Sequence, residues 1–168
     1  ASWYYAKRFF SPVSVSLNAI SDTDTEIWLH NGTHNTITSE ITVCVGDFFG
    51  NTPYEETIEV AVNPGSHKLK TIAAGGRFYP NVILRNRPRL YYIAASLKGE
   101  ERCTTRFFAV EKNILFPQAK LEVEATEKSI IITTDNFARF VKIDGDIEGL
   151  VFSDNYFDLL PQQQRTIT

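Results

Sequence analysis

The chain has 168 residues, of which 43% are hydrophobic and 22% charged, and its formal net charge is −3. This composition is too apolar for a disordered chain, and without a cationic field it disfavours nucleic acid and anionic membranes as partners. No charged n-region precedes an apolar h-region, and no apolar run reaches the roughly 18–20 residues of a membrane helix. Because the sequence opens with Ala1-Ser2-Trp3 and contains no Met, we expect a piece of a longer chain.

Apolar residues alternate with polar ones through most of the chain, which is typical of half-buried β-strands. Only Trp3 to Phe10 lacks this alternation, and we interpret it as the end of a helix. Strands are then predicted near residues 13–17, 26–30, 41–45, 58–62, 67–72, 90–97 and 104–110. Seven short strands, separated by turns such as Asn63-Pro64-Gly65-Ser66, are the number expected of an immunoglobulin-like sandwich.

Phe116-Pro117-Gln118 marks the predicted domain boundary. Beyond it, further strands are predicted at residues 120–125, 129–134, 140–143, 150–153 and 165–168. About fifty residues are close to the lower limit for an independent core, so we expect this second domain to lean on the first. The sequence predicts an all-β fold with two tandem immunoglobulin-like β-sandwich domains, over residues 1–116 and 117–168.

The two cysteines, Cys44 and Cys103, have a spacing that permits a disulfide of the immunoglobulin type. In the run 41–45, however, the branched apolar residues alternate with Thr42 and Cys44, which places Cys44 on the outer face of its sheet. We therefore expect the two thiols to be unpaired.

Histidines and acidic turns offer weak metal sites. His30 and His34 have the H-x3-H spacing of some metal sites, but they flank the turn Asn31-Gly32-Thr33 rather than sharing one helical face. The segment Asp144-Gly145-Asp146-Ile147-Glu148-Gly149 lacks the spacing of a calcium loop, and we interpret it as a solvated turn. We assign no metal ligand and no cofactor-binding residue.

Groups that could catalyse a reaction do not converge either. Asp22, Asp24 and Glu26 lie in one turn rather than across the cleft that a glycosidase pair needs. The arginines of Arg85-Asn86-Arg87-Pro88-Arg89 are interpreted as a solvated or inter-domain patch. We assign no catalytic residue.

Aromatic side chains are the stronger candidates, because sugar rings stack on flat exposed faces. We interpret Trp28 as a core residue of the kind that such sandwiches commonly contain. Tyr79, in a predicted loop, and Tyr91 and Tyr92, at the start of a strand, are the candidate carbohydrate-contact residues; one of the latter pair is alternatively a corner residue that hydrogen-bonds to the backbone. Asn31-Gly32-Thr33 also matches the glycosylation sequon, a short motif that is frequent by chance.

Two motifs are more specific than composition: WYYAKRFFSPV at residues 3–13, and FSDNYFDLLP at residues 152–161, followed by Arg165-Thr166-Ile167-Thr168. Together they resemble the C-terminal β-sandwich domains of family 2 glycoside hydrolases, specifically the β-mannosidase branch. One departure is Gln162-Gln163, where the family usually has Gly-Glu after the proline. We interpret the second motif as a turn followed by an apolar plug that seals the domain.

The resemblance implies a parent enzyme that is a retaining hydrolase of terminal β-D-mannosides, with two catalytic glutamates on a (β/α)8 barrel upstream of Ala1. No residue of this chain matches the family's catalytic motifs. The fragment would then be a non-catalytic accessory region whose partner is that barrel, without nucleic-acid, membrane or cofactor partners. A carbohydrate-binding module with its own sugar affinity and a protein-interaction module are the alternatives.

Overall fold

The structure is a computed structural model that describes residues 2–72, 87–145 and 151–168. The chain divides into two compact units, which we call the sandwich unit (residues 11–47 and 51–115) and the C-terminal unit (residues 1–10, 48–50 and 116–168). One division between the two units falls between residues 115 and 116, and the helical segment at the start of the chain is grouped with the C-terminal unit. The domain bounds 1–116 and 117–168 stay a prediction.

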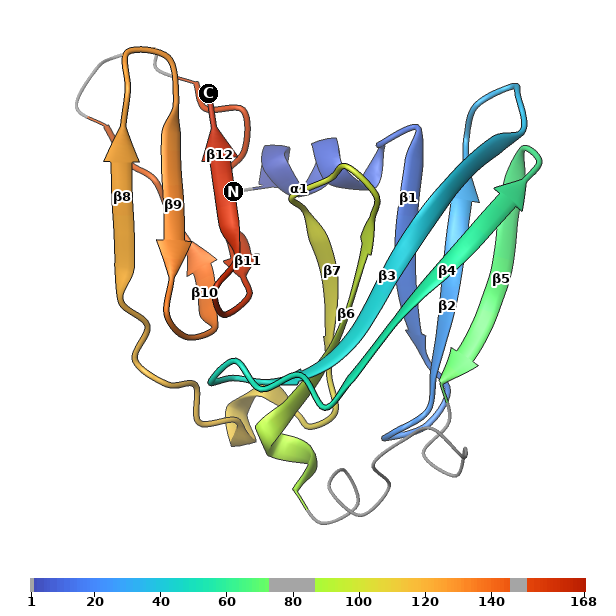
Figure 1. Cartoon of the computed structure of the whole chain (residues 1–168), viewed down its shortest axis with the longest axis horizontal. Helices are drawn as coiled ribbons and strands as arrows, with labels where there is room; N and C mark the ends of the chain where they lie inside the picture. The colour runs from blue at the N-terminus through green and yellow to red at the C-terminus, as the bar shows by residue number, and fades with distance from the viewer. Residues whose placement is uncertain (1, 73–86, 146–150) are drawn as a thin grey trace. The chain divides into compact units, whose positions relative to one another are not determined.

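The sandwich unit contains two antiparallel sheets (Figure 1). Their order is β1-β2-β5 in the first and β4-β3-β6-β7 in the second. The strands are β1 (Val13–Ala19), β2 (Thr25–Asn31), β3 (Ile37–Asp47), β4 (Tyr54–Val62), β5 (Gly65–Ile72), β6 (Tyr91–Leu97) and β7 (Cys103–Phe107), with short 3-10 helices η1 (Pro88–Leu90) and η2 (Glu111–Asn113). All seven strands predicted for this region are confirmed, with ends shifted by a few residues.

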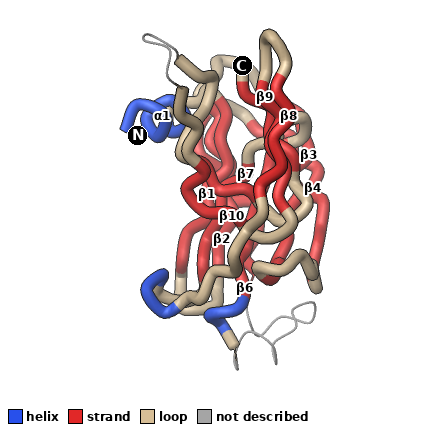
Figure 2. The backbone as a smooth tube through the Cα atoms, turned by 90° about the vertical axis from the view of Figure 1, so that its left-hand side faces the viewer, coloured by secondary structure: helices blue, strands red, loops and turns tan. Residues whose placement is uncertain are grey.

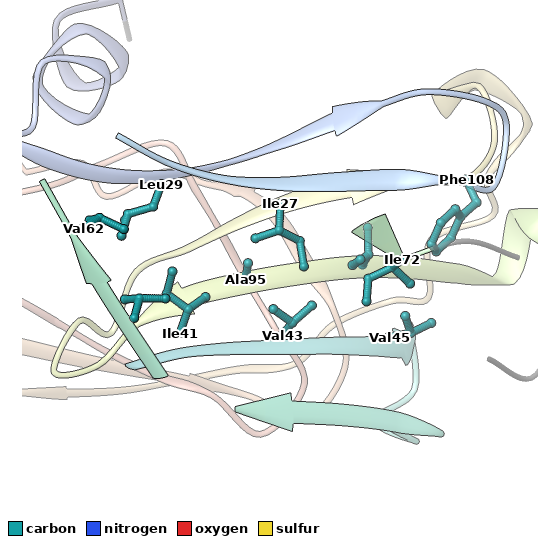
Figure 3. Packing of buried hydrophobic residues seen from close by; sticks show 11 residues of the cluster. Ile27, Leu29, Ile41, Val43, Val45, Val62, Ile72, Ala95 and Phe108 are labelled. Atoms are coloured by element: carbon teal, nitrogen blue, oxygen red, sulfur yellow. The ribbon is translucent and has the colours of Figure 1, made fainter. Parts of the chain in front are cut away.

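The core of the sandwich unit lies between its two sheets. Ile27 and Leu29 of β2 point toward Ile41 and Val43 of β3, and Ala95 of β6 lies among them (Figure 3). All five of these side chains are at most 2% exposed. Alternate residues of each strand fill this layer because successive side chains of a strand point to opposite faces.

The C-terminal unit begins with the helix α1 (Ser2–Phe9) and continues with short strands; Figure 2 shows α1 as a helix among elements that are otherwise mainly strands and loops. One sheet has the order β12-β9-β8 and the other pairs β10 with β11. The strands are β8 (Leu121–Ala125), β9 (Ile130–Thr134), β10 (Ala138–Val141), β11 (Phe157–Leu159) and β12 (Gln164–Ile167).

Two expectations for this unit are corrected. Residues 151–153 form no strand, and the predicted apolar plug contains β11, whose Phe157 and Leu159 pair with Val141 and Ala138 of β10. Both side chains are at most 4% exposed, so the plug is a strand of the core. None of the helices in the described part of the chain is long and apolar enough to cross a membrane.

Candidate functional site

A site with many hydrogen bonds in the C-terminal unit is built on Asp154 and Asn155, two turn-forming residues between Phe152 and β11. The Asn155 side chain is 4% exposed. Its Oδ1 accepts hydrogen bonds from the amides of Ile143 (2.8 Å) and Tyr156 (2.9 Å), and its Nδ2 donates to the Ile143 carbonyl (2.7 Å). The Asn155 amide thus hydrogen-bonds to the backbone of Ile143 as a neighbouring strand would. Buried polar groups without such partners would destabilise the fold.

Helix α1 is fixed to this turn through Arg8. The Arg8 guanidinium donates to Oδ1 of Asp154 from Nη2 (2.7 Å) and Nε (3.1 Å), and also to the carbonyls of Asn155 and Tyr156. Lys7 donates to the Ser153 carbonyl at 2.9 Å. The planar guanidinium can bind a carboxylate and neighbouring carbonyls at once, a geometry that lysine cannot reproduce.

A second arginine completes the site, which we call the Asp154 anchor (Arg8, Asp154, Asn155 and Arg165). Arg165 of β12 donates to Oδ2 of Asp154 and stacks its guanidinium 5.2 Å from the Phe157 ring centroid. The side chains of Asp154 and Arg165 are only 15% and 10% exposed. Burial alone would raise the pKa of Asp154, but the hydrogen bonds and charges of Arg8 and then Arg165 outweigh it and lower that pKa.

The Asp154 anchor joins the two sequence motifs that carry the family resemblance. Arg8 belongs to the first motif, while Asp154 and Asn155 belong to the second. Sequence reasoning singled out both motifs but did not pair them. The first motif contains an arginine and the second an acidic residue, but their positions in the sequence do not show that the two form a pair.

The predicted carbohydrate-contact residues lie in different environments. Tyr79 lies outside the described residues. Tyr91 is half-buried and packs against the core of the sandwich unit, whereas Tyr92, on the opposite face of β6, is 3% exposed. Its ring crosses Gly46 so closely that a Cβ on that glycine would lie 2.7 Å from the Tyr92 hydroxyl. Carbohydrate contact by these tyrosines stays a prediction.

The interpretation of Trp28 as a core residue is wrong. Its neighbours Ile27 and Leu29 fill the core, so the alternation of β2 turns the indole to the opposite face, where it is half-buried. There its Nε1 donates to Glu26 at 2.9 Å. This bond is the main reason that the pKa of Glu26 is lowered, and the nearby Lys68 adds to the effect. A carboxylate held ionised in this way is poorly suited to be a general acid.

His30 lies on the same outer face and comes nearest to a catalytic geometry. Its Nε2 lies 2.8 Å from Oγ of Ser16 and its Nδ1 lies 2.8 Å from Oγ of Ser66. In a catalytic triad a carboxylate binds the histidine and stabilises its imidazolium, whereas both partners of His30 are serine hydroxyls. The arrangement is therefore a structural link across β1, β2 and β5. Among the described residues, no three His, Cys, Asp or Glu side chains are placed to hold a metal ion.

The other carboxylate candidates lie in two acidic turns. Arg106 donates to the backbone carbonyls of Ser21, Asp22 and Asp24, which ties the acidic turn between β1 and β2 to β7. Asp144 pairs with Lys142, while residues 146–149 of the second acidic turn lie outside the described residues. The arginine cluster is likewise described only from residue 87 onward.

The sequon Asn31-Gly32-Thr33 is a structural turn. Asn31 is 2% exposed, its Nδ2 donates to the carbonyls of Asn35 (2.9 Å) and Val62 (3.1 Å), and its Oδ1 accepts from the Thr33 amide (3.0 Å) and hydroxyl (2.7 Å). Both ends of the amide are therefore engaged inside the fold.

Cys44 and Cys103 are not joined by a disulfide. Cys44 pairs in register with Ala94 and Cys103 with Ser96, so both thiols project from the same face of the sheet with β6 between their strands. Their Cα atoms are separated by two strand spacings of about 4.8 Å each, and this separation exceeds the Cα–Cα limit of roughly 7 Å for a disulfide. Burial, with a contribution from the Glu55 charge, raises the pKa of Cys44 to about 11, which suppresses its thiolate.

These observations define a class: an all-β protein with immunoglobulin-like sheets, whose described part contains the Asp154 anchor. Residues 112–168, about a third of the chain, match the family model of a mannosidase immunoglobulin-fold domain. The predicted resemblance to the immunoglobulin-like domains of β-mannosidase-like family 2 glycoside hydrolases is therefore confirmed. No curated protein matches the chain.

A solved structure shares the fold over nearly the whole chain. A β-D-mannosidase from Dictyoglomus thermophilum superposes over 99% of this chain with a TM-score of 0.78 at 20% identity, and the match covers 20% of that enzyme. A red sea bream transglutaminase (TM-score 0.46, 13% identity, 98% of this chain and 27% of that one) and a calcium-binding mutant of a Bacteroides uniformis β-glucuronidase (0.31, 13%, 79% and 16%) are more distant. This chain thus spans about one fifth of the β-mannosidase whose fold it shares.

Proposed function

We propose that the chain is the non-catalytic accessory and scaffolding region of a β-mannosidase-like glycoside hydrolase, whose remaining chain carries the catalytic barrel. The observation that carries the proposal is the match of residues 112–168 to the mannosidase immunoglobulin-fold model, together with the anchoring of residues 2–9 to that same unit by Arg8. The shared fold with one fifth of a β-D-mannosidase supports the same reading.

The experiment that tests this function compares the 168-residue protein with the complete chain encoded by its gene. We expect the complete chain to release an aryl alcohol from an aryl β-D-mannoside and the 168-residue protein to release none. Turnover by the 168-residue protein that survives repurification and is lost in a Ser16→Ala or His30→Ala variant would contradict the proposal.

A calorimetric titration of the 168-residue protein with mannose and mannan oligosaccharides tests the carbohydrate-binding alternative. The proposal expects no saturable heat. Saturable binding at millimolar or lower concentration, weakened by Tyr91→Ala, would favour a carbohydrate-binding module instead.

A further inference from the structure

Strand β8 is an edge strand whose apolar side chains are exposed. In its sheet β9 lies between β8 and β12, and within the described residues no strand pairs with the other edge of β8 (Figure 1). The Leu121 side chain is 41% exposed and that of Val123 58%. The unpaired amides and carbonyls of such an edge are a template for pairing with another strand.

The exposed apolar residues of β8 lie on the core-facing side of the sheet. Val123 pairs in register with Ile132, which belongs to the core of the C-terminal unit and is only 3% exposed. Residues that pair across two strands point to the same face of a sheet. The core that covers β9 therefore stops short of β8, and a further strand beside β8 would extend the apolar layer at Leu121 and Val123.

The backbone of β8 is oriented for such pairing. The Lys120 amide donates to Oδ1 of Asp135 at 2.8 Å, and the Lys120 carbonyl accepts from the Asp135 amide at 3.4 Å, so the backbone groups of Lys120 face the β9 side. Successive residues of a strand direct their backbone groups to opposite edges. The amides and carbonyls of Leu121, Val123 and Ala125 therefore face the free edge.

The other face of β8 carries charges that identify the partner strand. Lys120 and Glu122 form an ion pair of 3.2 Å on this face, and Glu124 follows on the same side. If a second copy of β8 pairs antiparallel about a two-fold axis at Leu121, Lys120 of each copy lies opposite Glu122 of the other. The contact is then self-complementary, because both copies contribute the same residues.

The neighbouring registers are opposed by like charges. An axis at Val123 sets Glu122 opposite Glu124 of the second copy, twice. An axis at Glu122 sets that carboxylate opposite its own copy. Opposite charges across a strand pair stabilise a sheet and like charges destabilise it, so charge favours the axis at Leu121.

We propose that β8 is a self-association edge at which two copies of this chain pair antiparallel about Leu121. The pairing joins the two three-stranded sheets into one and places the Leu121 side chains of both copies side by side on the apolar face. Strands this short bury far less than the roughly 800 Å² per partner of a stable complex, so the dimer is weak and reversible. The inference goes beyond the proposed function and does not depend on it.

Sedimentation velocity of the 168-residue protein tests the association. We expect the sedimentation coefficient to rise with concentration, with a dissociation constant on the order of 100 µM. Val123→Pro should abolish the rise and leave the circular dichroism spectrum unchanged, because it removes an amide that faces the free edge, where proline is tolerated. A wild-type protein that stays monomeric over this range, or a Val123→Pro variant that still dimerises, would overturn the inference.

A charge swap tests the register. Lys120→Glu should weaken the dimer at least about five-fold, because it sets like charges opposite each other. Lys120→Glu/Glu122→Lys should restore it, since both cross-strand pairs form again with reversed sign. Lys128→Glu is the matched control: it makes the same charge change at an exposed residue just after β8 and should leave the dissociation constant unchanged. Equal weakening by Lys120→Glu and Lys128→Glu, or a double variant as weak as Lys120→Glu alone, would overturn the inference.

Discussion

Nη2 of Arg8 lies 2.7 Å from Oδ1 of Asp154, although the two residues are 146 positions apart in the sequence. The pair makes the first ten residues part of the C-terminal unit. Because Asp154 also binds Arg165 and the amide of Asn155, one carboxylate holds together a helix, a turn and the last strand. Such a shared, mostly buried acceptor is costly to remove.

We expect Asp154→Asn to lower the free energy of unfolding by about 2–3 kcal/mol, because it leaves the guanidinium of Arg165 buried without a countercharge. Asp144→Asn is the matched control: Asp144 pairs with Lys142 but its side chain is 79% exposed, so solvent screens the pair and the loss should be too small to resolve. Urea denaturation followed by circular dichroism measures both. Equal losses in the two variants would show that the anchor does not stabilise the unit.

The same carboxylate predicts a pH dependence. Asp154 has a lower pKa in the folded state than in the unfolded state, so its contribution is complete above the ordinary aspartate value near 3.9 and is lost as the pH falls through the folded value. We expect the stability difference between the wild type and Asp154→Asn to be constant from pH 5 to 7 and to shrink below about pH 4. A difference that stays constant down to pH 2 would mean that charge does not hold the anchor.

Gln162 occupies a position that favours glycine. Its φ is 61°, in the left-handed region that costs a side-chain-bearing residue about 1–2 kcal/mol. A preference for glycine at this left-handed position would explain why the family that this chain resembles usually has Gly-Glu after the proline. We expect Gln162→Gly to raise the free energy of unfolding by about 0.5–1 kcal/mol after the entropic cost of glycine is subtracted. Gln162→Ala is the control, since it shortens the side chain without relieving φ; a matching gain from alanine would refute the explanation.

Gln163 supplies a hydrogen-bond acceptor that a glutamate at this position can also supply. Its Oε1 accepts a hydrogen bond from the Leu160 amide at 3.1 Å. We expect Gln163→Glu to be neutral within about 0.5 kcal/mol and Gln163→Ala to cost about 1 kcal/mol through the loss of that hydrogen bond. Thermal denaturation of the two variants provides the comparison. The prediction fails when glutamate costs as much as alanine.

Asn31 is expected to be structural rather than a glycan acceptor. Asn31→Ala removes the donor to the carbonyls of Asn35 and Val62 and the acceptor of Thr33, so we expect a loss of about 2–3 kcal/mol. Asn18→Ala, at an exposed position of β1, should change stability by less than about 0.5 kcal/mol. Chemical denaturation measures both, and a small effect at Asn31 would contradict the buried amide network.

Local pattern was sufficient for the sandwich unit. The period-two alternation located its seven strands, and it placed Cys44 on the face opposite Val43 and Val45. These features depend on neighbours along one strand, because successive side chains must point to opposite faces. The same rule should have turned Trp28 away from the core, and the preference of sandwiches for a buried Trp misled the interpretation.

Tertiary structure alone decided the rest. That Arg8 pairs with Asp154, that Phe157 and Leu159 form a strand, and that Asn31 is buried all depend on partners between four and 146 residues away. Sequence spacing does not identify such partners. The alternation pattern describes one strand at a time and holds no information on which distant segments the chain reversals bring together. The sequence by itself determined strands, faces and family motifs, whereas the anchor that joins those motifs exists only once the helix and the last strand meet one carboxylate.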